Sequence, residues 1–115
     1  MPTSCRRWGL TLLPMALLAG AAQAQGLPGD PARGQEVAME WCIECHEVVP
    51  GVREPSVTEA PPFQAVADDP AATETALRAF LQTPHATMPN LRPTPEQTDD
   101  LIAYILSLKG RRPGT

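Results

Sequence analysis

The chain has 115 residues, which is enough for one small domain and too few for several. Its 13 acidic side chains outnumber its 9 basic ones, and the formal net charge is −4. Because an acidic surface repels phosphate groups, this charge argues against nucleic acid or anionic lipid as a partner and favours a basic patch on another protein.

The first 24 residues have the features of a signal peptide for export. Arg6 and Arg7 precede an apolar run at residues 8–22, and Ala22-Gln23-Ala24 has the small-x-small pattern of a cleavage site. The run is shorter than the roughly 20 residues that a membrane-spanning helix needs. We therefore expect cleavage after Ala24, a periplasmic location, and a mature domain at residues 25–115 with no membrane span. Loss of the two arginines would take its net charge to −6.

Asp30 and Pro31 predict the start of a first helix, because aspartate caps a helix N-terminus and proline fits its first turn. The helix is expected to run to about Cys42. Gly34 inside it costs about 1 kcal/mol relative to alanine, so we expect another helix to cross closely at this glycine. The residues expected on the buried face are Val37, Ala38, Trp41 and Cys42.

Residues 42–46 read Cys-Ile-Glu-Cys-His, which is the C-x-x-C-H pattern of haem attachment. Residues three apart lie on one face of a helical turn, so Cys42 and Cys45 can each bond one vinyl group of the same porphyrin. His46 follows directly and is placed to bind the iron as its proximal axial ligand. The pattern predicts one covalently attached haem c.

Two other interpretations of these residues stay open at this point. Trp41 and the following C-x-x-C resemble the active site of thioredoxin-type dithiol exchangers, but that chemistry needs a βαβ setting and no segment here is typical of a strand. The second is a zinc site formed by Cys42, Cys45, His46 and His85, although zinc ligands usually come as two spaced pairs.

Residues 47–68 are rich in proline, glycine and valine without a clear period, and we expect a loop there. Pro61 and Pro62 are candidate residues of the cofactor site. A proline carbonyl can accept a hydrogen bond from Nδ1 of His46 and so fix the tautomer of the imidazole. The alternative is an ordinary extended Pro-Pro stretch.

Asp69 and Pro70 repeat the cap-and-proline pattern and predict a second helix that ends at Thr83-Pro84. A helix in this position would lead directly into the loop around residue 88. Its expected apolar stripe consists of Ala72, Ala76, Leu77, Phe80 and Leu81.

The loop after this helix contains Met88, and Pro89 follows to hold the backbone extended. We predict that Met88 is the distal iron ligand. A thioether opposite an imidazole favours ferrous iron, and filling the sixth position leaves no open site for a substrate. His85 is the competing ligand, whereas Met39 lies one turn before Cys42 and is expected to pack in the core.

Thr94, Pro95 and Gln97 predict the start of a last helix, with Thr94 as the N-cap and Gln97 completing a capping box. Gly110 is the expected stop of this helix. Its apolar stripe consists of Leu101, Tyr104, Ile105 and Leu108.

The order of these parts resembles that of the class I c-type cytochromes over the whole of residues 25–115. The shared parts are a glycine-containing helix, C-x-x-C-H, a proline loop, a helix, a Met-Pro loop and a C-terminal helix with L-x-x-Y at residues 101–104. Gly34 and the 101–104 segment are similar to the two sides of that family's helix crossing. The resemblance implies an all-α cytochrome c fold, with three or more helices wrapped around one covalently attached haem c.

We therefore expect an electron carrier between extracytoplasmic redox partners rather than an enzyme, and we predict no catalytic residue. Partners are expected to bind weakly at the haem edge near Cys42 and Cys45. The protein would act as a monomer or as the electron-transfer subunit of a larger periplasmic dehydrogenase. The remaining alternatives are the dithiol exchanger and a haem enzyme or gas sensor in which Met88 leaves the iron.

Overall fold

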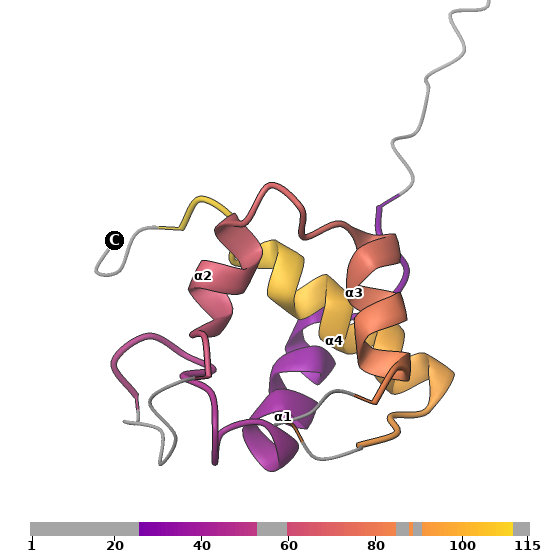
Figure 1. Ribbon diagram of the computed structural model, residues 1–115, viewed down its shortest axis with the longest axis horizontal. Helices are drawn as coiled ribbons and strands as arrows, with labels where there is room; N and C mark the ends of the chain where they lie inside the picture. The colour runs from indigo at the N-terminus through magenta and orange to yellow at the C-terminus, as the bar shows by residue number, and fades with distance from the viewer. Residues whose placement is uncertain (1–25, 53–59, 85–87, 89–90, 112–115) are drawn as a thin grey trace, which may run out of the picture.

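The structure is a computed structural model that describes residues 26–52, 60–84, 88 and 91–111. These residues form four helices and no strand: α1 (Pro31–Trp41), α2 (Phe63–Asp68), α3 (Glu74–Gln82) and α4 (Pro95–Ser107) (Figure 1). The predicted all-α class is confirmed. No helix within these ranges is long and apolar enough to cross a membrane. The predicted signal peptide at residues 1–24 lies outside the described residues.

Helix α1 crosses α4 at Gly34, as the sequence predicted. A Cβ atom at this position would collide with the backbone carbonyl of Asp100 and would lie 2.8 Å from Cβ of Tyr104. Glycine is therefore the residue that lets the two backbones approach this closely. Ala38, one turn further along α1, is fully buried and continues the contact.

The start of α1 is fixed on the first half of α4 by contacts that the sequence did not reveal. Gly29 has a φ of 101°, and a Cβ atom there would collide with the backbone carbonyl of Asp99. The buried carboxylate of Asp100 accepts the N–H of Asp30 at 2.6 Å and lies 3.4 Å from Nε of Arg33. These contacts join the predicted N-cap of α1 to the neighbouring helix.

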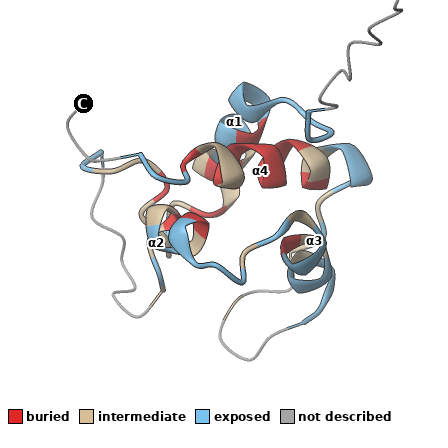
Figure 2. Cartoon of the chain, turned by 90° about the horizontal axis from the view of Figure 1, so that it is seen from above, coloured by how far each residue is buried: buried red, intermediate tan, exposed pale blue. Residues whose placement is uncertain are grey.

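Helix α4 supplies more of the hydrophobic core than any other described helix, and Figure 2 shows it buried along much of its length with the other helices around it. Its predicted capping box is present. The Thr94 hydroxyl accepts the N–H of Gln97 at 3.2 Å, and the Gln97 side chain accepts the N–H of Thr94 at 2.9 Å. Its buried apolar residues, together with one just after its end, are Leu101, Ile102, Ala103, Tyr104, Ile105 and Leu108.

The loop predicted at residues 47–68 is wrong at its C-terminal end, where α2 forms. Phe63 and Ala67, one turn apart, are buried in the core. The side chain of Gln64 donates to the carbonyl of Leu108 at 2.8 Å, which ties α2 to the end of α4. This six-residue helix has no side-chain cap, so it depends on tertiary contacts that a local sequence pattern does not show.

The second predicted helix begins later than expected. Asp69 is the C-cap of α2, and its carboxylate accepts the N–H of Ala71 at 2.8 Å in a short turn. The Thr73 side chain caps α3 instead, and α3 begins at Glu74. The predicted end at Thr83 is correct. The Asp-Pro pair was a misleading signal because Asp69 already belongs to the preceding helix.

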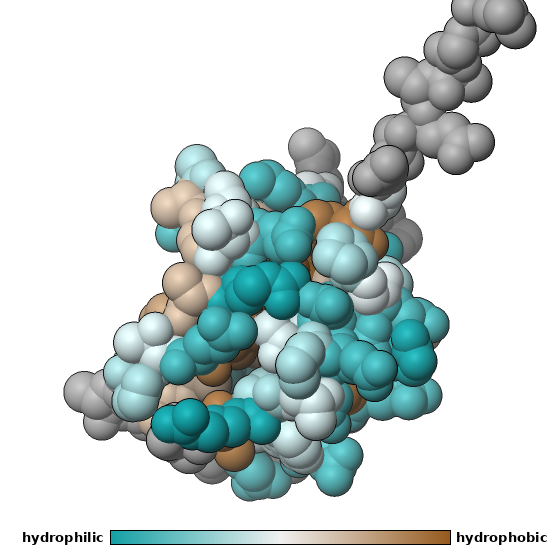
Figure 3. All heavy atoms as spheres, turned by 90° about the vertical axis from the view of Figure 1, so that its right-hand side faces the viewer, coloured by the Kyte–Doolittle hydropathy of each residue, from teal (hydrophilic) through white to brown (hydrophobic). Residues whose placement is uncertain are grey.

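The side of the molecule on which α3 and the start of α4 lie is mostly hydrophilic, with small hydrophobic patches (Figure 3). The stripe predicted for α3 is only partly buried: Leu77 is buried, whereas 52% of the Phe80 surface is exposed. The apolar stripe of α3 is therefore not fully covered by the hydrophobic core.

Candidate functional site

Residues 42–46 form a tight turn at the C-terminal end of α1. The backbone carbonyl of Cys42 accepts the N–H of Cys45 at 3.1 Å and the N–H of His46 at 2.8 Å. Cys42 is itself the C-cap of α1. All three side chains leave this one turn and line the same cavity.

This central cavity has a volume of about 690 Å³. Pockets for small molecules and cofactors typically have volumes of roughly 300–1,000 Å³. Leu77 and Phe80 of α3 line it together with the 42–46 turn, and most of its remaining lining is apolar. The exposure of Phe80 is explained by this position, because its ring borders the cavity.

The imidazole of His46 is held in one tautomer by a backbone contact. Its Nδ1 lies 2.7 Å from the carbonyl oxygen of Pro61. A carbonyl can only accept, so Nδ1 carries the proton and Nε2 keeps its lone pair for a metal. The ring of Phe63 packs against the imidazole with a centroid distance of 5.3 Å. The hydrogen bond predicted for the Pro-Pro pair is therefore made by Pro61, whereas Pro62 is the N-cap of α2.

The chain after His46 is held by two hydrogen bonds to distant residues. The carbonyl of Glu47 accepts the N–H of Phe63 at 3.0 Å, and the carbonyl of Val48 accepts the Tyr104 hydroxyl at 2.8 Å. Burial raises the pKa of the Tyr104 hydroxyl, so it stays a proton donor. Tyr104 of α4 therefore fixes the segment that carries the histidine.

Replacement of Tyr104 by phenylalanine is expected to lower the free energy of unfolding by about 1–3 kcal/mol, because the buried Val48 carbonyl loses its donor. Denaturant unfolding followed by circular dichroism measures this. Ser107→Ala is the matched control, since Ser107 donates to the Tyr104 carbonyl at 2.7 Å from a half-buried position. Ser107→Ala should lower the free energy of unfolding by less than about 1 kcal/mol. Equal losses in the two variants would contradict this role for Tyr104.

The two thiols are poorly suited to disulfide exchange. Burial, together with the nearby Cys45 thiol, raises the pKa of Cys42 to about 11. An attacking cysteine needs a lowered pKa, which such enzymes obtain at the N-terminus of a helix, whereas Cys42 lies at the C-terminus of α1. The described residues also contain no strand to form a βαβ unit. This geometry argues against the dithiol interpretation.

The zinc interpretation gains no support from the described part of the chain. Within it, no group of three or more His, Cys, Asp or Glu side chains is placed to hold a metal ion. His85, the fourth ligand of that interpretation and the competing distal iron ligand, lies outside the described residues.

Met88 is half-buried and lines the same cavity as His46. The structure therefore brings the predicted proximal and distal ligands to one cavity. Met39 is not among the residues that line it and packs, partly buried, against the hydrophobic core.

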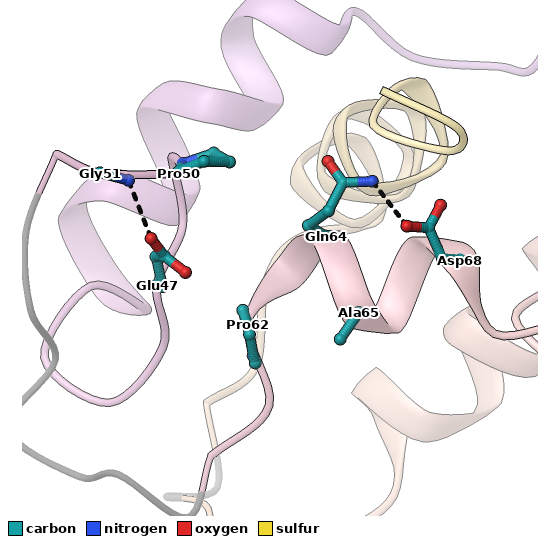
Figure 4. A pocket seen from close by; sticks show the side chains of 7 residues that line it. All are labelled: Glu47, Pro50, Gly51, Pro62, Gln64, Ala65 and Asp68. Atoms are coloured by element: carbon teal, nitrogen blue, oxygen red, sulfur yellow. Dashed lines mark hydrogen bonds between the residues drawn. The ribbon is translucent and has the colours of Figure 1, made fainter. Parts of the chain in front are cut away.

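A second hollow of about 510 Å³ lies between the loop after His46 and α2 (Figure 4). Its two acidic side chains already have partners. Glu47 accepts the N–H of Gly51 at 2.8 Å, and Asp68 accepts from Gln64 at 2.9 Å. This hollow lacks the thiol, imidazole and thioether groups of the central cavity, so it is not the candidate site.

Several residues of the central cavity were not predicted as site residues. Val66, Leu77 and Phe80 line it, yet in the sequence they only form part of a loop or of an apolar helical stripe. An apolar stripe does not distinguish a helix that faces the core from one that faces a cofactor. The one available signal was the small number of aromatic residues, which leaves the protein core thin without a cofactor.

The groups at the central cavity fit haem c: two thiols three residues apart, an imidazole with a free Nε2 and a thioether, all within a mostly apolar enclosure. Comparisons with curated proteins and with solved structures give no match. The family model described as cytochrome C oxidase, cbb3-type, subunit III, a cytochrome c domain, matches residues 29–105, which is more than half of the chain. The chain therefore belongs to this family of class I c-type cytochromes and has the all-α cytochrome c fold.

Proposed function

We propose that this protein is a single-haem electron carrier whose iron is bound axially by His46 and Met88. Membership of the cytochrome c family implies a covalently bound haem c and an electron-transfer role. The observation that carries the finer proposal is that one cavity is lined by both cysteines, His46 and Met88.

Each of these residues has a defined part in the proposed function. When bound, haem c supplies an iron that cycles between the ferric and ferrous states. Cys42 and Cys45 fasten the porphyrin to the turn after α1, and His46 offers Nε2 to the iron while Pro61 keeps the proton on Nδ1. Met88, which lines the same cavity, would supply a thioether as the second protein ligand. With both ligands kept in either oxidation state, electron transfer would need little rearrangement of these residues.

The apolar lining of the cavity also favours electron transfer. Leu77, Phe80 and Val66 give the cavity apolar walls that would shield a bound haem from water. A dry enclosure and a thioether ligand both favour the ferrous state, which carries one less positive charge. We therefore expect a high reduction potential for a haem protein.

We further propose that the mature domain comprises residues 25–115 and acts in the periplasm after cleavage behind Ala24. Cytochrome c domains are typically extracytoplasmic. The charged, apolar and small-residue parts of residues 1–24 support a signal peptide.

A second candidate is a role as the electron-transfer subunit of a larger enzyme. The matching family is described as a subunit of a cbb3-type oxidase, and a subunit of a periplasmic dehydrogenase is the alternative to a free carrier that we predict from the sequence. In either case the partners are redox proteins that approach the haem edge near Cys42 and Cys45. Elution of the native protein alone at monomer size would favour the free carrier, whereas a stable complex would favour the subunit.

The proposed function is tested by a redox titration of the exported protein combined with addition of carbon monoxide. A carrier with two protein ligands is expected to show one reversible one-electron wave and no spectral change with carbon monoxide, because no coordination position is open. Rapid carbon monoxide binding to the ferrous protein would contradict this function and favour a haem enzyme or gas sensor.

A further inference from the structure

Helix α3 has few connections to the rest of the fold. Among the described helices it packs against α4 and against neither α1 nor α2. Yet it contributes Leu77 and Phe80 to the central cavity and leads into the segment that contains Met88. The contact between α3 and α4 therefore decides where this wall of the cavity lies.

Arg78 bridges these two helices. Its Nη2 lies 2.6 Å from Oδ1 of Asp99 on α4 and 3.1 Å from Oε1 of Glu74, one turn earlier on α3. Only 31% of the Arg78 side chain and 31% of the Asp99 side chain are exposed. Arg78 directly follows Leu77, which is buried and lines the cavity. The ion pair is thus adjacent in sequence to a residue of the cavity wall.

The α4 end of this bridge is itself held rigidly. The backbone of Asp99 is in close contact with Gly29, and the next residue, Asp100, accepts the N–H of Asp30 at 2.6 Å. The crossing of α1 and α4 therefore fixes Asp99, and Arg78 transmits that fixed position to α3.

Exposed ion pairs contribute little to global stability. A bridge of this kind has a larger effect on position, because α4 alone among the described helices holds α3 in place. Loss of the ion pair between Arg78 and Asp99 should therefore let α3, which forms one wall of the cavity, move without unfolding the domain.

We propose that Arg78 is a positioning residue for the distal side of the haem site: its ion pair with Asp99 holds α3, and with it Met88, in the position that lets the thioether bind the iron. This inference rests on the proposed function, because it takes Met88 as the distal ligand. Arg78 is not among the residues that line the cavity, so we infer that it acts through the position of α3.

The test follows the methionine-to-iron charge-transfer band of the ferric protein while the pH is raised. At high pH stronger ligands displace the thioether, and the midpoint of this loss reports how firmly Met88 is held. Arg78→Gln is expected to lower the midpoint by about one pH unit, which is a tenfold shift in the exchange equilibrium. Arg78→Lys keeps the positive charge but lacks the planar guanidinium group. Its midpoint should therefore lie between those of Arg78→Gln and the unmodified protein.

Arg33→Gln is the matched control. It removes the same charge from another ion pair with α4, in which the exposed Arg33 side chain lies 3.4 Å from the buried Asp100 carboxylate, and α1 makes no contact with α3 among the described helices. Its midpoint should equal that of the unmodified protein, and thermal unfolding of all variants in the ferrous state should be similar. Asp99→Asn should reproduce the effect of Arg78→Gln, and the double variant should add nothing further.

Two results would overturn the proposal. Equal midpoints in Arg78→Gln and the unmodified protein would show that the bridge does not position the ligand, and equal shifts in Arg78→Gln and Arg33→Gln would show a general charge effect. Both leave the proposed function intact. Absence of the band in the unmodified protein at neutral pH would instead refute Met88 ligation and, with it, this inference.

Discussion

Replacement of Gly34 by alanine is expected to lower the free energy of unfolding by about 3 kcal/mol or more. The added Cβ would collide with the carbonyl of Asp100, and a backbone carbonyl in the middle of a helix cannot move aside without shifting the whole crossing. The usual gain of about 1 kcal/mol from alanine in a helix is too small to offset this. For a domain of this size the loss corresponds to a fall in Tm of more than about 10 °C.

Thermal unfolding of the purified protein, followed by circular dichroism, measures this effect. Gln35→Ala is the matched control, because Gln35 is the next residue of α1 and is exposed. Its Tm should be unchanged or slightly raised by the better helix propensity of alanine. A Gly34→Ala variant as stable as the Gln35→Ala variant would contradict the close helix crossing.

Replacement of Met88 by alanine is expected to remove the methionine-to-iron charge-transfer band and to lower the reduction potential. Loss of the thioether removes the ligand that favours ferrous iron. Axial ligands control haem potentials over about 0.8 V, so we expect a fall on the order of 0.1 V or more. The vacated position should also let the ferrous protein bind carbon monoxide. Optical spectra and a redox titration measure all three effects.

Met39→Ala is the control for this experiment. Met39 is also half-buried, but it packs on the core instead of lining the central cavity. Its replacement should cost about 1–2 kcal/mol of stability and leave the band in place. Persistence of the band in Met88→Ala would contradict the assignment, and loss of the band in His85→Ala alone would give the distal position to the histidine.

The elements predicted correctly are those whose signals are local. Asp30 and Thr94 cap their helices through bonds to residues two and three positions away, so the chain around them is sufficient to identify them. Gly34 was recognisable because a glycine in a helix has a cost that only a close contact offsets. The His46 contact with Pro61 was predicted from the chemistry of a metal-ligating imidazole.

The elements missed are those that depend on the assembled fold. Helix α2 forms because Phe63 is buried against α4, and α3 begins late because Asp69 is already used by α2. The ion pair between Arg78 and Asp99 joins residues 21 positions apart, and no sequence pattern around either residue predicts the pairing. The role of Phe80 at the cavity was missed because an apolar helical stripe has the same sequence pattern whether it faces a protein core or a cofactor.

The central claim is that haem c is covalently attached at Cys42 and Cys45, and the intact mass of the exported protein tests it most directly. We predict the mass of residues 25–115 plus one haem, retained after denaturation and lost when both cysteines are replaced by alanine. A colourless protein with the mass of the polypeptide alone would contradict the claim.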